Sequence, residues 1–155
     1  MSLDIDFIIT TIQRILKPVT VELFRGKLVN LHYSLLPAYG CVIGMKTIEL
    51  AKTNNAKIIG TTCHFVDENL DAGQIISQGC MRVDWNNDYD SICNLIFQIG
   101  CITLLNGILT ILSIEMGNSN LHEIEKDILY SPKLKFNSSI IQLNLWQKIK
   151  YNDTI

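Results

Sequence analysis

The spacing at which hydrophobic residues recur changes several times along this chain of 155 residues. Short apolar runs rich in β-branched residues are typical of buried strands, whereas apolar residues three or four apart are typical of amphipathic helices. These patterns predict strands over residues 7–11, 28–32, 57–66 and 74–83, and helices over residues 19–24, 44–54 and 91–114. A chain of this length suits a single domain with a buried core.

The last predicted helix is also a candidate membrane span, because residues 91–114 contain no charged side chain. Its polar side chains recur mostly at spacings of three and four, which predicts a polar stripe along an apolar helix. The stripe consists of Gln98, Thr103, Asn106, Thr110 and Ser113. We therefore expect a surface helix packed on the protein, and no membrane partner.

The composition changes after Met116, where Gly117 to Asn120 is typical of a turn or linker. A second apolar group follows at Ile140, Ile141, Leu143, Leu145, Trp146 and Ile149. We expect this group to fold over the core as an extended piece and a short helix. The predicted division is therefore a main region, 1–116, and a C-terminal extension, 117–155, that packs on the same domain.

Charge and cysteine usage exclude several classes of protein. The net charge of −2, without a long basic run, lacks the positive field of a nucleic-acid binder. The five cysteines are odd in number and show no metal-ligand spacing, which favours reduced thiols in a cytoplasmic protein and implies no metal site. The acidic start of the chain lacks the cationic and apolar segments of a signal peptide.

Candidate chemistry lies at the end of the predicted strand 28–32. Because side chains alternate along a strand, Asn30 and His32 project from the same side, and Pro37 follows where the alternation stops. In open α/β sheets, binding sites lie beyond the carboxyl ends of parallel strands. Alone, however, this pair is more typical of a capped turn, and the triplet Asp71-Ala72-Gly73 is ordinary turn chemistry.

A larger pattern changes this interpretation. Residues 30–37, NLHYSLLP, are followed by GTTCHFVDENLDAGQIISQ at residues 60–78. Together these segments resemble the folate-dependent formyltransferase family, whose signature is Asn-x-His-x-Ser-Leu-Leu-Pro with a later Leu-Asp-x-Gly turn. The resemblance covers about residues 4 to 85 and is strongest for the glycinamide ribonucleotide formyltransferase and formyltetrahydrofolate deformylase branches. It implies an α/β fold with a truncated formyltransferase-type open sheet, mostly parallel, and flanking helices.

The chain departs from that family in four places, two of which are Tyr33, where most members have proline or histidine, and Thr10-Thr11, which replace a glycine-containing segment. Members begin with strand-helix units that carry a glycine-rich loop, and no such loop precedes Asp4, so the resemblance implies that the N-terminal part of the domain is lacking. The segment Ala38-Tyr39-Gly40 also places its glycine one residue early. We therefore expect the loop on the acceptor side of the site to differ from the family.

The resemblance implies a reaction and a set of catalytic residues. The expected formyl donor is 10-formyltetrahydrofolate and the expected acceptor is a small-molecule amine. Asn30 and a protonated His32 would donate hydrogen bonds to the formyl oxygen as it becomes negative, and Asp71 would assist His32 and relay a proton. Two alternatives stay open: a formyltetrahydrofolate deformylase, in which water replaces the amine, and a non-catalytic folate-binding or interaction fragment.

A flat pterin requires apolar walls and a few placed polar atoms. The family resemblance assigns these folate contacts to Arg14, Ile15, Leu16, Val66 and Leu70, together with backbone groups of the 67–71 loop. His64 lies inside a predicted strand and is more typical of a core histidine; the alternative is a supporting role behind the site.

In the resembling fold, the strand 7–11, from Phe7 to Thr11, lies in the middle of the sheet and pairs with a strand from the lacking region. Soluble proteins normally pair or cover such an edge. We expect this edge to be covered by the 121–155 tail, by a second copy in a homodimer or by a partner chain.

Overall fold

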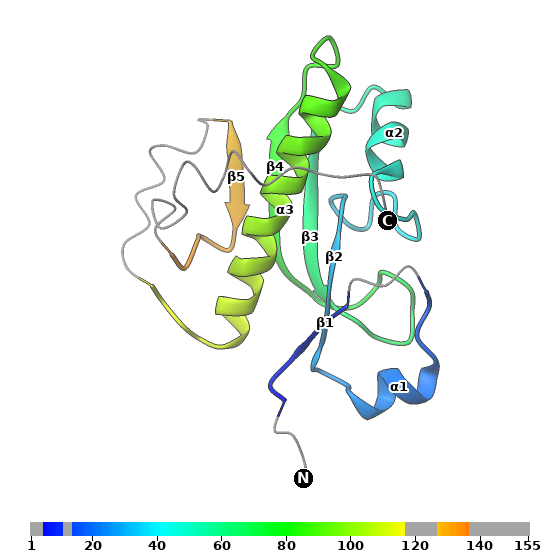
Figure 1. The fold of residues 1–155 in the computed structure, drawn as a ribbon, viewed down its shortest axis with the longest axis vertical. Coiled ribbons are helices and arrows are strands. Elements are labelled where there is room, and N and C mark those ends of the chain that lie inside the picture. The colour runs from blue at the N-terminus through cyan, green and yellow to red at the C-terminus, as the bar shows by residue number, and fades with distance from the viewer. Residues whose placement is uncertain (1–4, 11–13, 117–126, 137–155) are drawn as a thin grey trace.

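The computed structural model describes residues 5–10, 14–116 and 127–136. Its centre is one sheet in the order β1-β2-β3-β4-β5 (Figure 1). The strands are β1 (Ile8–Thr10), β2 (Leu28–His32), β3 (Ile58–Phe65), β4 (Ile75–Arg82) and β5 (Ile128–Ser131), and the helices are α1 (Pro18–Leu23), α2 (Lys46–Thr53) and α3 (Tyr89–Ile111). The strands and helices expected between residues 7 and 114 are confirmed, with their ends shifted by a few residues.

The open sheet with flanking helices is confirmed, but its strands are not mostly parallel. Only β1 and β2 run parallel among the described pairs, whereas β2–β3, β3–β4 and β4–β5 are antiparallel. The connections account for the directions of two of these pairs. Parallel strands need a crossover, which α1 supplies between β1 and β2, while β3 and β4 are joined by a short loop that only antiparallel strands allow.

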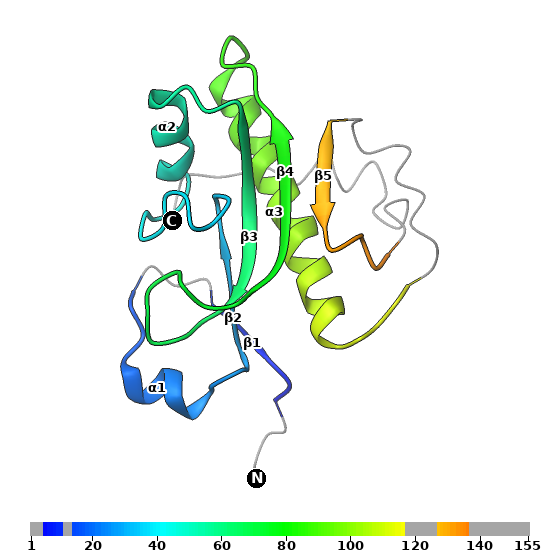
Figure 2. The same ribbon diagram turned by 180° about the vertical axis from the view of Figure 1, so that it is seen from behind.

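Helix α3 covers one face of the sheet, as the opposite views in Figures 1 and 2 show. Its Ile96 and Ile99 are fully buried and share one apolar cluster with Ile48 of α2 and Ile59 of β3. The helix and the sheet approach closely at Gly107, where an added Cβ would lie 2.5 Å from the Cys63 sulfur. The burial of these aliphatic side chains is the main apolar stabilisation of the sheet.

Two residues of the polar stripe of α3 lie inside the protein, whereas Ser113 beyond its end is exposed. Thr103 and Asn106 are fully buried, and each is hydrogen-bonded. The hydroxyl of Thr61 donates to Thr103 Oγ1 at 2.9 Å, and Asn106 Nδ2 donates to the Pro132 carbonyl at 2.9 Å. By length and composition α3 could cross a membrane, yet more than half of its most apolar window is buried against the rest of the chain.

The described part of the C-terminal extension lies at the sheet edge opposite β1. Strand β5 pairs with β4, and Leu134 and Phe136 are buried against Ile102 and Leu109 of α3. The expectation that the tail covers β1 is therefore wrong for residues 127–136. The apolar group predicted at residues 140–149 lies outside the described residues, and the division at residue 116 stays a prediction.

Candidate active site

The loop that joins β3 to β4 brings Asp71 to the end of β2. The loop lies beside α1 (Figures 1 and 2), where Arg25 Nη2 is 3.0 Å from Glu68 Oε2. Its closure depends on Gly73, because an added Cβ there would lie 1.8 Å from the Phe65 carbonyl oxygen. Asp71 itself adopts a φ of 53°, in the left-handed region that Asp tolerates better than most residues.

The carboxylate of Asp71 lies between two histidines. Its Oδ2 is 3.4 Å from His32 Nδ1, and its Oδ1 is 3.8 Å from His64 Nε2. The Asp71 side chain is only 11% exposed and both histidines are almost fully buried. At such burial the charge of a carboxylate acts more strongly on its neighbours than it would in water.

Asn30 lies beside His64 because the two residues are partners in the register of β2 and β3. Asn30 Nδ2 is 3.4 Å from His64 Nε2, while its Oδ1 is 3.4 Å from the hydroxyl of Thr10, its register partner on β1. The Thr10 hydroxyl also donates to the Val29 carbonyl oxygen at 3.1 Å, so its proton is shared between that oxygen and Asn30 Oδ1. With Oδ1 facing this hydroxyl, Asn30 presents an N–H donor, rather than its carbonyl, toward the imidazole of His64.

His32 is held by protein oxygens at both ring nitrogens. Its Nε2 is 3.1 Å from the Tyr39 carbonyl oxygen, and its Nδ1 faces Asp71. A carbonyl oxygen only accepts hydrogen bonds, so Nε2 carries a proton in this arrangement. The structure thus brings the predicted residues Asn30, His32 and Asp71 together, with His32 behind Asp71.

The position of His64 inside a strand is typical of a core histidine. The structure places His64 beside Asn30 and Asp71. Its Nδ1 is 2.8 Å from the Phe65 carbonyl oxygen. Burial lowers the pKa of His64 below its ordinary value, although the nearby Asp71 opposes this effect. A neutral ring with its proton on Nδ1 leaves Nε2 free to accept from Asn30.

The lowered pKa of His64 predicts how stability depends on pH. Between the two pKa values the unfolded chain binds the proton more readily, so the free energy of unfolding falls as pH drops below the ordinary value of 6.5. Denaturant titrations over a pH series should show a shallower fall for His64→Gln than for the natural chain. An unchanged or steeper fall in His64→Gln would contradict a buried neutral His64.

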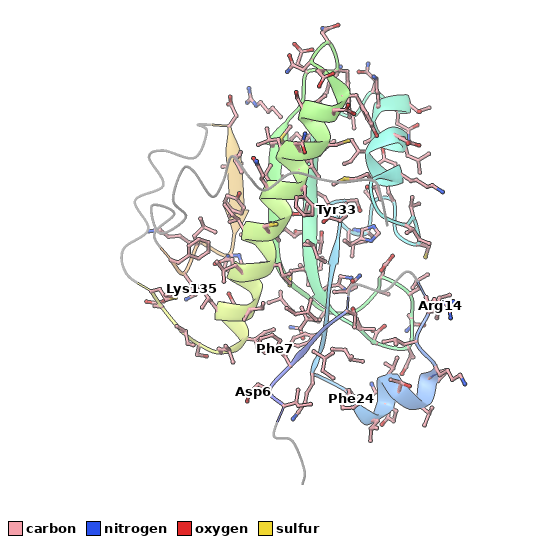
Figure 3. The ribbon with its side chains drawn as sticks, viewed as in Figure 1. Asp6, Phe7, Arg14, Phe24, Tyr33 and Lys135 are labelled. Carbon is pink, nitrogen blue, oxygen red and sulfur yellow. The ribbon has the colours of Figure 1, made fainter. Side chains whose placement is uncertain are left out.

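A pocket of about 200 Å³ opens beside these side chains. All the residues predicted to contact folate line it, namely Arg14, Ile15, Leu16, Val66 and Leu70. Figure 3 shows Arg14 on the segment that leads into α1, near the β3–β4 loop. Asn30, His64 and Asp71 also line the pocket. The exposed surface of its walls is largely apolar, and the polar Asp67, Glu68 and Asn69 of the β3–β4 loop line it as well.

Sequence reasoning missed Thr10 as a pocket residue and underrated His64. Both are placed by the pairing of Asn30 with its neighbours across the sheet, and the sequence carries no signal for that register. Among the described residues, no cluster of His, Cys, Asp or Glu is arranged to hold a metal ion.

A carboxylate between two histidines, beside a pocket in an open α/β sheet, is an arrangement typical of enzyme sites that bind small molecules. The chain belongs to the formyl transferase family, whose profile matches residues 2–105. The family resemblance seen in the sequence is thereby confirmed.

Curated proteins similar to this chain include formyltetrahydrofolate deformylases. Formyltetrahydrofolate deformylase of Escherichia coli K12 is 44% identical over 71 residues, which are 46% of this chain and 24% of that protein. The deformylase of Bacillus subtilis 168 is 34% identical over 93 residues, or 59% of this chain and 30% of that protein. The chain therefore spans roughly a quarter of the length of these curated relatives.

Similar solved structures represent this branch and a second one. A formyltetrahydrofolate deformylase from Pseudomonas syringae pv. tomato matches with a TM-score of 0.63 and 27% identity, over 74% of this chain and 38% of that one. Phosphoribosylglycinamide formyltransferase from Anaplasma phagocytophilum matches with a TM-score of 0.63 and 28% identity, over 74% and 55%. The fold is therefore shared with both branches.

Proposed function

We propose that the pocket binds the pterin of a reduced folate and that the formyl group of 10-formyltetrahydrofolate lies against Asn30 and Asp71. The observation that carries this proposal is the position of the polar cluster, which opens on the pocket lined by the predicted folate contacts. A largely apolar pocket with a few placed polar groups suits a flat heterocycle, and Asn30 and Asp71 in its lining can face the reacting group.

In the proposed reaction, Asn30 polarises the formyl carbonyl. Thr10 and His64 orient its amide, and the remaining N–H donates to the oxygen as negative charge develops there. Asp71 takes a proton from the attacking group and passes it, directly or through water, to the folate nitrogen. Because both ring nitrogens of His32 face protein oxygens, we propose that His32 acts on the reaction through Asp71.

The reaction needs no covalent intermediate on the protein. The bond from the attacking atom to the formyl carbon forms, the bond from that carbon to the folate nitrogen breaks, and the nitrogen receives the proton. The buried hydroxyl of Ser34 donates to the Ala38 carbonyl and is therefore not available as a nucleophile.

The curated relatives favour water as the acceptor, because those compared above are formyltetrahydrofolate deformylases. An amine is the second candidate, supported by the equal structural similarity to a phosphoribosylglycinamide formyltransferase. Incubating the chain with 10-formyltetrahydrofolate, with and without glycinamide ribonucleotide, separates the two. Formate without the amine supports hydrolysis, and formylated amine supports transfer.

A third outcome of this experiment is neither product. With folate bound, it would support the non-catalytic folate-binding module that the sequence also allows, since the chain spans only part of its relatives. With no folate bound, it would contradict the proposed function.

We further propose that a second copy of the chain covers β1. No described residue pairs with the outer edge of β1, where Ile9 is 38% exposed. The Ile8 N–H donates to the Lys27 carbonyl at 2.7 Å, so the Ile9 N–H faces outward by alternation. A homodimer would pair these outward groups.

Ile9→Pro tests this interface, because proline removes the outward donor without removing a bond to β2. Light scattering should give a dimer for the natural chain and a monomer for Ile9→Pro. A natural chain that stays monomeric at high concentration would contradict the homodimer and leave a separate partner chain as the alternative.

A further inference from the structure

The loop after β2 touches both His32 and Asp71 through its backbone. The Tyr39 carbonyl oxygen is 3.1 Å from His32 Nε2, and the Cys41 N–H donates to Asp71 Oδ2 at 2.8 Å. The same Oδ2 lies 3.4 Å from His32 Nδ1. Two residues of one loop thus contact the pair, one at each member, and neither contact depends on a loop side chain.

This loop has an unusual backbone conformation. Tyr39 has a φ of 56° and Cys41 a φ of 66°, in the left-handed region where residues other than glycine are strained. The glycine between them, Gly40, is not in that region. Strain that persists beside a site is a reason to look for what the strained backbone does there.

Neighbouring contacts hold the conformation. The Tyr39 hydroxyl accepts from Asn54 Nδ2 at 3.2 Å, and the Ala38 N–H donates to the Leu35 carbonyl at 3.0 Å. With Tyr39 and Cys41 both left-handed, the carbonyl of the first faces His32 and the amide of the second faces Asp71.

We propose that residues 39–41 form a backbone clamp that positions the His32–Asp71 pair, and that Cys41 is a positioning residue through its amide rather than its thiol. The role of the clamp in catalysis rests on the proposed function. The Cys41 amide and His32 both lie against Oδ2, which leaves Oδ1 facing His64. Backbone groups suit this task because they are fixed before the substrate arrives.

Amide hydrogen exchange measured by NMR on the full chain tests the clamp without requiring turnover. Replacing Asp71 with alanine should speed exchange of the Cys41 amide by about tenfold or more, the factor expected for losing a hydrogen bond to a charged group. The Ala38 amide, whose acceptor is a backbone carbonyl in the same turn, is the matched control and should change little. Equal exchange of the Cys41 amide in both proteins would overturn the proposal.

A second pair of variants changes the clamp at Cys41 itself. Cys41→Gly keeps the amide and adopts a positive φ freely, whereas Cys41→Val is disfavoured there. We expect kcat of the valine variant to lie about tenfold or more below that of the glycine variant, with similar KM for the folate, because small displacements at a reacting centre are costly. Equal kcat in the two variants would overturn the positioning role and leave the proposed function standing. Altered Cys41 exchange in a chain that releases no formyl group would support the clamp and count against the proposed function.

Discussion

Replacing Asp71 with asparagine is expected to lower kcat for formyl release by about 10²–10⁴-fold, the contribution typical of a positioned general acid or base. The amide keeps the shape of the side chain and can still accept from the Cys41 N–H. It cannot take up the proton of the attacking group, and it offers His32 no negative charge. Affinity for the folate should change far less, because the apolar walls of the pocket are untouched.

Steady-state formation of formate and tetrahydrofolate measures this effect. Asp84→Asn is a matched control, because Asp84 is an exposed carboxylate in the turn after β4. It should keep the natural rate. An Asp71→Asn variant that is as active as this control would show that Asp71 carries no proton in the reaction, and the proposed mechanism would fail.

Replacing Asn30 with alanine is expected to lower kcat by about 10²–10³-fold, the usual loss when one donor to a developing oxyanion is removed. The amide is oriented by Thr10 and His64, so its donor is in place before the formyl group arrives. The effect should fall on kcat more than on KM, because the oxygen becomes strongly negative only in the transition state.

Asn87→Ala serves as the control for that measurement, because Asn87 is exposed in the turn before α3. Both variants should unfold at nearly the same denaturant concentration as the natural chain. If Asn30→Ala instead raised KM and left kcat unchanged, Asn30 would be a binding residue and not a donor to the transition state.

The hydrophobic pattern predicted the elements of the fold but not the directions of the strands. Alternation in 28–32 and helical spacing in 44–54 correspond to β2 and α2. The direction of each strand depends on the path of the connections before and after it. The periodicity of hydrophobic residues does not reveal that path. The stripe on α3 shows the same limit: Thr103 and Asn106 have helical spacing whether they face water or, as here, hydrogen-bond partners inside the protein.

The residues of the candidate site also differ in whether the sequence could predict them. Asn30, His32 and Asp71 could be selected because they stand in a motif with a chemical rationale, although their roles stay predictions. Thr10 and His64 come to the site through the register of three strands, and a one-residue shift would remove both. The contacts of Tyr39 and Cys41 are made by backbone atoms, which leave no mark in the amino-acid sequence.

Calorimetric titration with 5-formyltetrahydrofolate, a stable analogue of the donor, tests the central claim most directly. We expect saturable heat from the natural chain and none from Val66→Glu, which places a charge in the apolar wall of the pocket. Circular dichroism on both proteins would establish that they are folded. Folded natural protein that gives no saturable heat at millimolar ligand would contradict the assignment of this pocket to a folate.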